Sequence, residues 1–475
     1  MGRNDLLIRT FPSTVKHTVI ERRSIDYVPD NERFGSAMGQ FTLWLGVNLN
    51  ITAIVTGALA VVLGGDVFWS LIGLFIGQIL GSIIMGLQAI QGPATGLPQM
   101  IRSRMQFGVY GAVIPLLLVS FLYIGFSAGG TLLAGQAVAK ILNAAEWQGI
   151  VLFGVITILV ATLGYRAIHS LARIASVVGI IAFIYMFVAL LAGHNISSLL
   201  EQRKFILNQF ILSISLAAAW QIAYGPYVGD YSRYLPTDTS KLKVFFAAAS
   251  GTTLGSQAAM TFGVFSAAIA GVAFTGHEVE FVVNLGASGL VASLLYFVVG
   301  FGKITMMTLN AYSSYMSSAT LVNGFRGKAT VSVGHRFIYV SAMILLAVSI
   351  ALWGSGSFIH AFSSFLLFLL TFISPWSAIC LADWQWGHRS KCDLQALNDP
   401  QGIYGRWNWS VISIYFIGLL MELPFVSSSI YTGPIASLLD GADISWLVGL
   451  IGTGIVYYIY SRILPPASMK IQAAD

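Results

Sequence analysis

The chain has 475 residues, of which 56% are hydrophobic and only 9% are charged, and its mean hydropathy is +0.78. A soluble domain carries roughly 25% charged residues, so this composition excludes a soluble enzyme and a disordered protein. Long unbroken apolar runs also exclude an outer-membrane barrel, whose strands alternate over about ten residues. A polytopic all-α membrane protein, surrounded by the lipid bilayer, remains.

The net charge of +6 does not indicate a nucleic-acid partner, because the basic residues are spread over short loops. The first 35 residues are polar and basic and lack the apolar core of a cleavable signal peptide. Cys380 and Cys392 have no metal-ligand spacing, so we expect free thiols on or near the cytoplasmic side.

Apolar segments long enough to cross a bilayer follow one another along the chain, and we expect one transmembrane domain over 36–465. The flanking segments 1–35 and 466–475 are then cytoplasmic tails. The twelve predicted spans cover approximately 38–63, 68–90, 110–140, 148–165, 170–193, 206–228, 243–273, 289–319, 335–353, 358–383, 408–427 and 443–464.

The distribution of basic residues predicts the orientation of these spans. With both termini in the cytoplasm, every Lys and Arg falls in a cytoplasmic segment except Lys140, Arg203, Lys204 and Lys303. The first three lie in predicted outside loops. Lys303 falls inside a predicted span, where it could snorkel to an interface, pair with a carboxylate or occupy a transport pathway.

Polar side chains inside the first span mark a candidate site. Asn48, Asn50 and Thr52 lie close together between two glycines in the stretch FTLWLGVNLNITAIVTGAL (41–59). The amides could simply hydrogen-bond neighbouring helices. Alternatively, the helix is locally unwound and its carbonyls and amides meet a ligand or an ion.

The sixth span contains Gly225-Pro226, which must break the helical hydrogen-bond ladder near residue 222. Trp220, Gln221 and Tyr224 directly precede the break. An aromatic ring beside an amide suits a flat ligand that also forms hydrogen bonds, and the group lies too deep for an interfacial aromatic belt.

Two further spans carry candidate binding residues. In the third span, Tyr123, Phe126, Ser127 and Gly130 share one helical face, which suits either a ring-thick slot or ordinary packing. In the eighth span, the side chains that could bind an ion or read a ligand edge are Thr305, Thr308 and Asn310.

Signs of catalysis are missing from the sequence, so we do not expect an enzyme. HExxH, Walker, GxSxG and CxxC patterns are absent, and His, Asp and Glu show no metal-ligand spacing. Glu422 is a lone carboxylate in the eleventh span, where a proton site and a pair with a neighbouring helix are both open.

Several stretches together resemble the nucleobase:cation symporter-1 family, and most closely its purine–cytosine permease branch. They occur in order over nearly the whole chain. The stretches are IDYVPDNERFGS (25–36), GPATGLPQMIRSRMQFGVYG (92–111), YGPYVGDYSRYLP (224–236), FGKITMMTLNAYS (301–313), LADW (381–384), YGRWNWSVISIYFIG (404–418) and YTGPIASLLDGADIS (431–445).

The resemblance implies a leucine-transporter-type fold, in which five helices are repeated in inverted topology and two extra helices follow. The first repeat would cover about 38–193, the second about 206–383 and the extra helices about 408–464. It also implies cation-coupled import of a nucleobase across the cell membrane, with sodium or a proton as the coupling ion and no cofactor. We expect a monomer.

Family members hold the flat base between aromatics of the third and sixth helices. The resemblance places these at Phe126 and at Trp220 or Gln221, and it places the amide that reads the base edge at Asn310. Sodium in relatives lies between carbonyls of the first helix and hydroxyls of the eighth. This arrangement points to the segment from Asn48 to Thr52 and to Thr305 or Thr308.

One departure from the family pattern bears on the substrate. A third-helix glutamine of the hydantoin branch falls near Gly130 here, which argues against hydantoin or allantoin. The expected cargo is therefore cytosine, a purine or both. A transporter for allantoin, uracil or thiamine is the alternative, and a non-translocating receptor is a further one.

Overall fold

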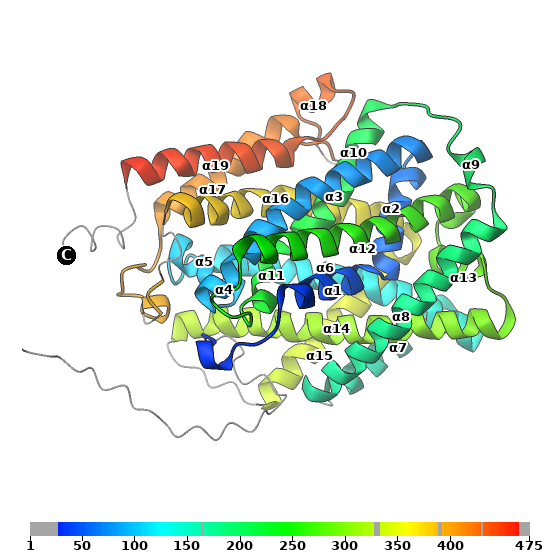
Figure 1. The fold of residues 1–475 in the computed structure, drawn as a ribbon, viewed down its shortest axis with the longest axis horizontal. Coiled ribbons are helices and arrows are strands. Elements are labelled where there is room, and N and C mark those ends of the chain that lie inside the picture. Colours follow the sequence, from blue (N-terminus) through cyan, green and yellow to red (C-terminus); the bar gives the residue numbers. More distant parts are fainter. Residues whose placement is uncertain are drawn as a thin grey trace, which may run out of the picture.

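The computed structural model describes residues 27–162, 165–326, 333–387, 392–394, 396–428 and 431–464, and these are almost entirely helical. Figure 1 shows the long helices lying side by side in one bundle. The longer helices are α1 (Ala37–Asn48), α2 (Ile51–Val62), α3 (Val67–Ala89), α6 (Val113–Leu142), α7 (Glu146–Thr162), α8 (Tyr165–Gly193), α10 (Leu207–Ile222), α12 (Lys241–Ala270), α14 (Gly289–Arg326), α15 (Val333–Gly354), α16 (Phe358–Trp386), α17 (Trp409–Glu422) and α19 (Ser445–Ile463).

Shorter helices lie in the connections between the long ones. Two of them, α4 (Gln91–Thr95) and α5 (Gln99–Phe107), lie between the second and the third predicted span. The others are α9 (Ile196–Leu199), α11 (Gly225–Ser232), α13 (Glu278–Asn284) and α18 (Pro434–Leu438).

A helix lies at the position of each predicted span, but the helices differ in how well they suit a bilayer. Eight helical stretches among the described residues are long and apolar enough to cross, or nine if the bent pair α1 and α2 is one span. One of the eight, Phe337–Trp386, has 50 residues and contains both α15 and α16, separated by a 3-10 turn. The apolar stretches Glu146–Ala161 and Trp409–Phe425 are shorter.

The first predicted span is broken, as one of its two interpretations required. α1 and α2 meet at an angle of 61°. The Asn50 side chain stabilises both helix ends, because its Oδ1 accepts from the backbone N–H of Thr52 at 2.9 Å and its Nδ2 donates to the Val47 carbonyl at 2.8 Å. Asn50 is therefore a side-chain cap that joins two helices across the break.

The sixth predicted span is interrupted where Gly225-Pro226 predicted a break. α10 ends at Ile222 and α11 begins at Gly225. Proline lacks the N–H that the Ile222 carbonyl would accept in a continuous helix. The two pieces stay aligned closely enough to count as one 26-residue stretch, Leu207–Ser232, so this break bends the span less than the first one.

Small residues let α2 and α12 pack closely. A Cβ added at Gly57 would lie 2.2 Å from the Met260 carbonyl oxygen, and one added at Gly263 would lie 1.8 Å from the Ile54 carbonyl oxygen. Backbone-to-backbone approach of this kind is typical of helix pairs in membranes. The contact fixes the second half of the broken span against α12.

Candidate functional site

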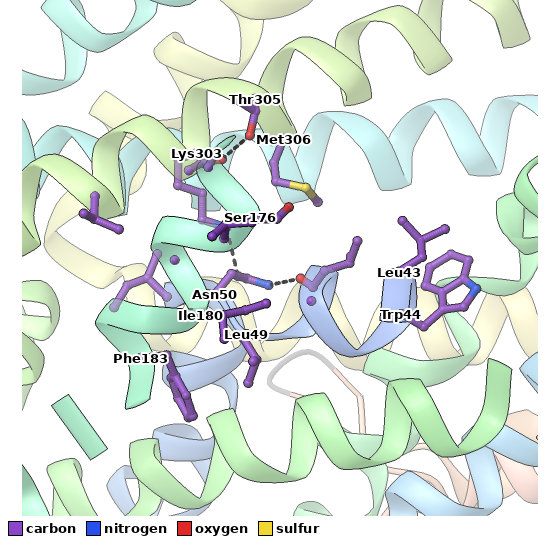
Figure 2. Close-up of a pocket in the computed structure, with 18 of the residues that line it drawn as sticks. Leu43, Trp44, Leu49, Asn50, Ser176, Ile180, Phe183, Lys303, Thr305 and Met306 are labelled. Atoms are coloured by element: carbon purple, nitrogen blue, oxygen red, sulfur yellow. Dashed lines mark hydrogen bonds between the residues drawn. The ribbon is translucent and has the colours of Figure 1, made fainter. Parts of the chain in front are cut away.

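A cavity of about 580 Å³ lies at the break between α1 and α2. Its walls come from α1, α2, α6, α8, α11 and α14, and Figure 2 shows side chains from several of them converging on it. A smaller recess of about 40 Å³ adjoins it. Residues shared by both spaces are Asn50, Tyr224, Tyr227, Lys303, Met306 and Asn310.

Asn48 joins the two interrupted spans from behind the cavity wall. Its Oδ1 accepts from the Trp220 indole N–H at 2.6 Å and from the Tyr224 hydroxyl at 3.0 Å. Its Nδ2 donates to the Trp44 carbonyl at 2.6 Å and to Thr252 Oγ1 at 3.0 Å. All four hydrogen-bonding positions of this fully buried amide are used, so it orients the aromatic residues that face the cavity.

Aromatic rings of α6, α10 and the turn before α11 line one side of the recess. The Phe126 and Trp220 centroids lie 5.6 Å apart at an interplanar angle of 85°, and Trp220 meets Tyr224 at 6.1 Å and 87°. Phe126 and Trp220 therefore touch edge to face and leave no parallel slot between them. A base held between the two would require one ring to turn.

The structure separates Trp220 from Gln221, which the sequence alignment could not do. Trp220 lines the recess, whereas Gln221 lies away from both cavities. The Gln221 amide is fully buried and contacts α3 and α12, where its Nε2 donates to Gln78 Oε1 and to Ser256 Oγ. Asn48 and Gln221 thus support the wall and, like Thr308, line neither space.

Asn310 lines both the main cavity and the recess from α14. Its side chain is half-buried and forms no hydrogen bond to another described residue. An amide that projects into a cavity with two free donors and a free acceptor can read the polar edge of a ligand.

The predicted sodium ligands Thr52, Thr305 and Thr308 each take part in a hydrogen bond within the protein. Thr305 Oγ1 donates to the Gly302 carbonyl at 2.8 Å, and Thr308 Oγ1 donates to the Ile304 carbonyl at 3.0 Å, so both bond back along α14. Thr52 instead contacts Lys303. Thr305 lines the main cavity together with Lys303, Thr52 lines the recess, and Thr308 lines neither space. A sodium site formed by these hydroxyls stays a prediction.

Lys303 lines both the cavity and the recess, and no carboxylate among the described residues pairs with it. Its side chain is 7% exposed, and its Nζ donates to Asn50 Oδ1 at 3.1 Å and to Thr52 Oγ1. Figure 2 shows it reaching from α14 to the start of α2. Lys303 is the sole charged residue among the described residues that line the two spaces.

Tyrosines add to the wall, and sequence reasoning found only some of them. Tyr123, Tyr224, Tyr227 and Tyr231 all line the main cavity. The last three are spaced i, i+3, i+7, so helical periodicity places them on one face and could have identified the whole row.

Glu422 lies elsewhere, in the interface between α17 and α19. It is fully buried against Gly449, and neither carboxylate oxygen has a hydrogen-bond partner among the described residues. It lines neither the cavity nor the recess. Within the described ranges, no group of three or more His, Cys, Asp or Glu side chains could hold a metal ion.

Known proteins are similar to this chain over nearly its whole length. The chain is 33% identical over 453 residues to the Bacillus subtilis (strain 168) protein named "Putative purine-cytosine permease YxlA", covering 93% of this chain and 96% of that one. It is 23% identical over 455 residues to the purine-cytosine permease fcyB of Emericella nidulans, covering 90% and 86%.

Solved structures share the fold. The inward-facing conformation of Mhp1 matches with a TM-score of 0.75 at 18% identity and covers 95% of both chains. A closed conformation of Mhp1 with bromovinylhydantoin bound, described as a nucleobase-cation-symport-1 family transporter, matches with a TM-score of 0.71 at 19% identity, covering 94% and 96%. The family model described as "Permease for cytosine/purines, uracil, thiamine, allantoin" matches residues 27–449. The chain therefore belongs to this family of membrane permeases, the nucleobase:cation symporter-1 family.

Proposed function

We propose that this protein imports cytosine, a purine or both by cation symport, through alternating access. The proposal is carried by the position of the Asn310 amide, which forms no hydrogen bond to another described residue, beside the aromatic wall of Phe126, Trp220 and Tyr224 around one cavity. A nucleobase is flat and has donors and acceptors on its edge, so it suits this combination of rings and amide.

In the proposed bound state the base lies in the main cavity with its edge on Asn310 and a face on an aromatic ring. Because Phe126 and Trp220 touch, binding turns one ring or leaves the base against a single ring. The names of YxlA and fcyB support cytosine or a purine as the cargo. Gly130, at the expected position of the glutamine of the hydantoin branch, argues against hydantoin or allantoin.

We further propose twelve crossings arranged as two inverted five-helix repeats plus two helices, in a monomer of the cell membrane with both termini cytoplasmic. The broken pair α1 and α2 and the interrupted pair α10 and α11 support the repeat, because they would be the first helices of the two halves. Alternating access is supported by the two Mhp1 states that resemble this fold.

A symporter for another small heterocycle is the second candidate. The vitamin B6 transporter TPN1 of Saccharomyces cerevisiae is 26% identical over 307 residues, covering 61% of this chain and 52% of that protein. A binding competition separates the candidates, with cytosine, adenine, hypoxanthine, uracil, allantoin, thiamine and pyridoxine as competitors.

Asn310→Ala tests the recognition step. Loss of the amide should weaken base binding by about 1–3 kcal/mol, or roughly 5- to 150-fold. Asn195→Ala is the matched control, because Asn195 is an exposed asparagine in the segment between α8 and α9. Binding of labelled cytosine to Asn310→Ala with the affinity of the wild type would refute the assignment.

A further inference from the structure

Lys303 holds the broken first span to α14. Its ammonium donates to Asn50 Oδ1 at 3.1 Å and to Thr52 Oγ1, which are the side chains at the start of α2. Both acceptors lie in the segment where the family resemblance places sodium. The Lys303 ammonium thus occupies oxygens that a bound sodium ion would need.

Lys303 packs against a glycine of the facing helix. A Cβ added at Gly130 of α6 would lie 3.6 Å from Lys303 Cδ and 3.9 Å from Lys303 Nζ, which is ordinary van der Waals contact. The Lys303 side chain therefore fills the space in front of Gly130.

The surroundings of the ammonium contain no compensating negative charge. Its two hydrogen-bond acceptors are neutral, and no Asp, Glu or His lines the cavity or the recess in the part of the chain that the structure describes. The titratable groups that face the same space are Tyr123, Tyr224, Tyr227 and Tyr231. The positive N-terminal end of α2 adds to the charge of Lys303.

A second cation at this position would be repelled. While the Lys303 amine is protonated, Coulomb repulsion between it and a second cation disfavours binding of that cation. Asn50 Oδ1 is also already shared by Lys303 and by the backbone N–H groups of Thr52 and Ala53. The positive charge of Lys303 and the shared Asn50 oxygen therefore both disfavour sodium binding at this position.

We propose that the Lys303 ammonium takes the place of a bound sodium ion, so that transport by this protein does not require sodium. The inference rests on the proposed nucleobase transport. It deepens that function by naming the cation that organises the site, and it leaves the proton as the driving cation.

Two measurements on the wild-type protein test this proposal independently. Binding of radioactive sodium to the purified protein needs no substrate, and we expect no saturable binding. Uptake of labelled cytosine into proteoliposomes should change less than twofold when choline replaces sodium under a constant proton gradient. Saturable sodium binding that Thr52→Ala abolishes, or uptake that stops in choline, would overturn the proposal.

Substitution of the lysine tests its role directly. Lys303→Met keeps the length of the side chain but removes both hydrogen bonds, and we expect uptake to fall roughly tenfold or more. Lys243→Met is the control, because Lys243 is exposed near the start of α12. Unchanged uptake by Lys303→Met in choline would contradict the proposed role of the hydrogen bonds from Lys303 to Asn50 and Thr52. If the variant does not fold, the two measurements on the wild-type protein decide the question.

The outcomes also separate this inference from the proposed function. If no base is transported in any salt and sodium still does not bind, the substrate assignment fails while the assignment of Lys303 holds. If base uptake is robust but requires sodium, the transport function holds and the assignment of Lys303 fails.

Discussion

Substitution of Asn48 should uncouple the two interrupted spans. In Asn48→Ala, the Trp220 indole N–H loses its acceptor at 2.6 Å, and the Tyr224 hydroxyl loses its acceptor at 3.0 Å. The Trp220 side chain is 4% exposed, so water cannot easily replace the lost acceptor, whereas the Tyr224 hydroxyl belongs to a residue that lines the cavity.

The size of the effect follows from which groups are left unpaired. A buried N–H without a partner costs about 1–3 kcal/mol, and the loss of the Tyr224 bond adds about 0.5–1.5 kcal/mol. Thr252 keeps a hydrogen bond, since its Oγ1 also donates to Gln221 Oε1 at 2.6 Å. We therefore expect Asn48→Ala to lower the free energy of unfolding by about 2–4 kcal/mol.

A double-mutant cycle with Trp220→Phe isolates this interaction. In the wild-type background Trp220→Phe should destabilise the protein, because a hydrogen bond is lost. In the Asn48→Ala background the same change should stabilise it, because it removes the unpaired N–H. The assay is reversible unfolding of the detergent-purified protein, and the expected coupling is about 1–3 kcal/mol. Equal destabilisation by Trp220→Phe in both backgrounds would refute the reasoning.

Three further changes have defined outcomes. Phe126→Ala should weaken cytosine binding about tenfold by removing an aromatic contact, whereas Phe297→Ala, at a surface position 58% exposed, should not; equal affinities would contradict the aromatic wall. Gly57→Val should lower the melting temperature, because its Cβ would lie 2.2 Å from the Met260 carbonyl oxygen, while Gly454→Ala, with nothing within 4 Å, should be neutral. Burial raises the pKa of the Cys392 thiol to about 11, so in a Cys380→Ser background an impermeant maleimide should label Cys392 from the cytoplasmic side only, about tenfold faster per pH unit above 7. Labelling from outside would overturn the orientation.

The helices and their breaks were predictable because their causes are local. Apolar runs determine where helices lie, and a proline such as Pro226 lacks the N–H that a continuous helix needs. The break at Asn50 was visible as one of two possibilities. Its geometry, in which one amide caps α2 and bonds to the end of α1, depends on the turn itself and could not be assigned from the sequence.

The partners of individual side chains were less predictable, because they depend on contacts between distant parts of the chain. Adjacent residues on a helix point about 100° apart, so Trp220 and Gln221 face different surroundings, and only the packing of α10 decides which one reaches the cavity. Lys303 is 253 residues from Asn50, and no local pattern indicates that pair.

Concentrative uptake of labelled cytosine by proteoliposomes tests the central claim most directly. Purified protein would be reconstituted and given an inward proton gradient, with unlabelled adenine, hypoxanthine, uracil and allantoin as competitors and Asn310→Ala as the weak-binding reference. We predict that the wild type accumulates labelled cytosine above the outside concentration, that unlabelled cytosine or a purine reduces this uptake, and that Asn310→Ala takes up cytosine more slowly. If folded wild-type protein accumulates no base under a proton or a sodium gradient, the account of this protein as a nucleobase symporter is contradicted.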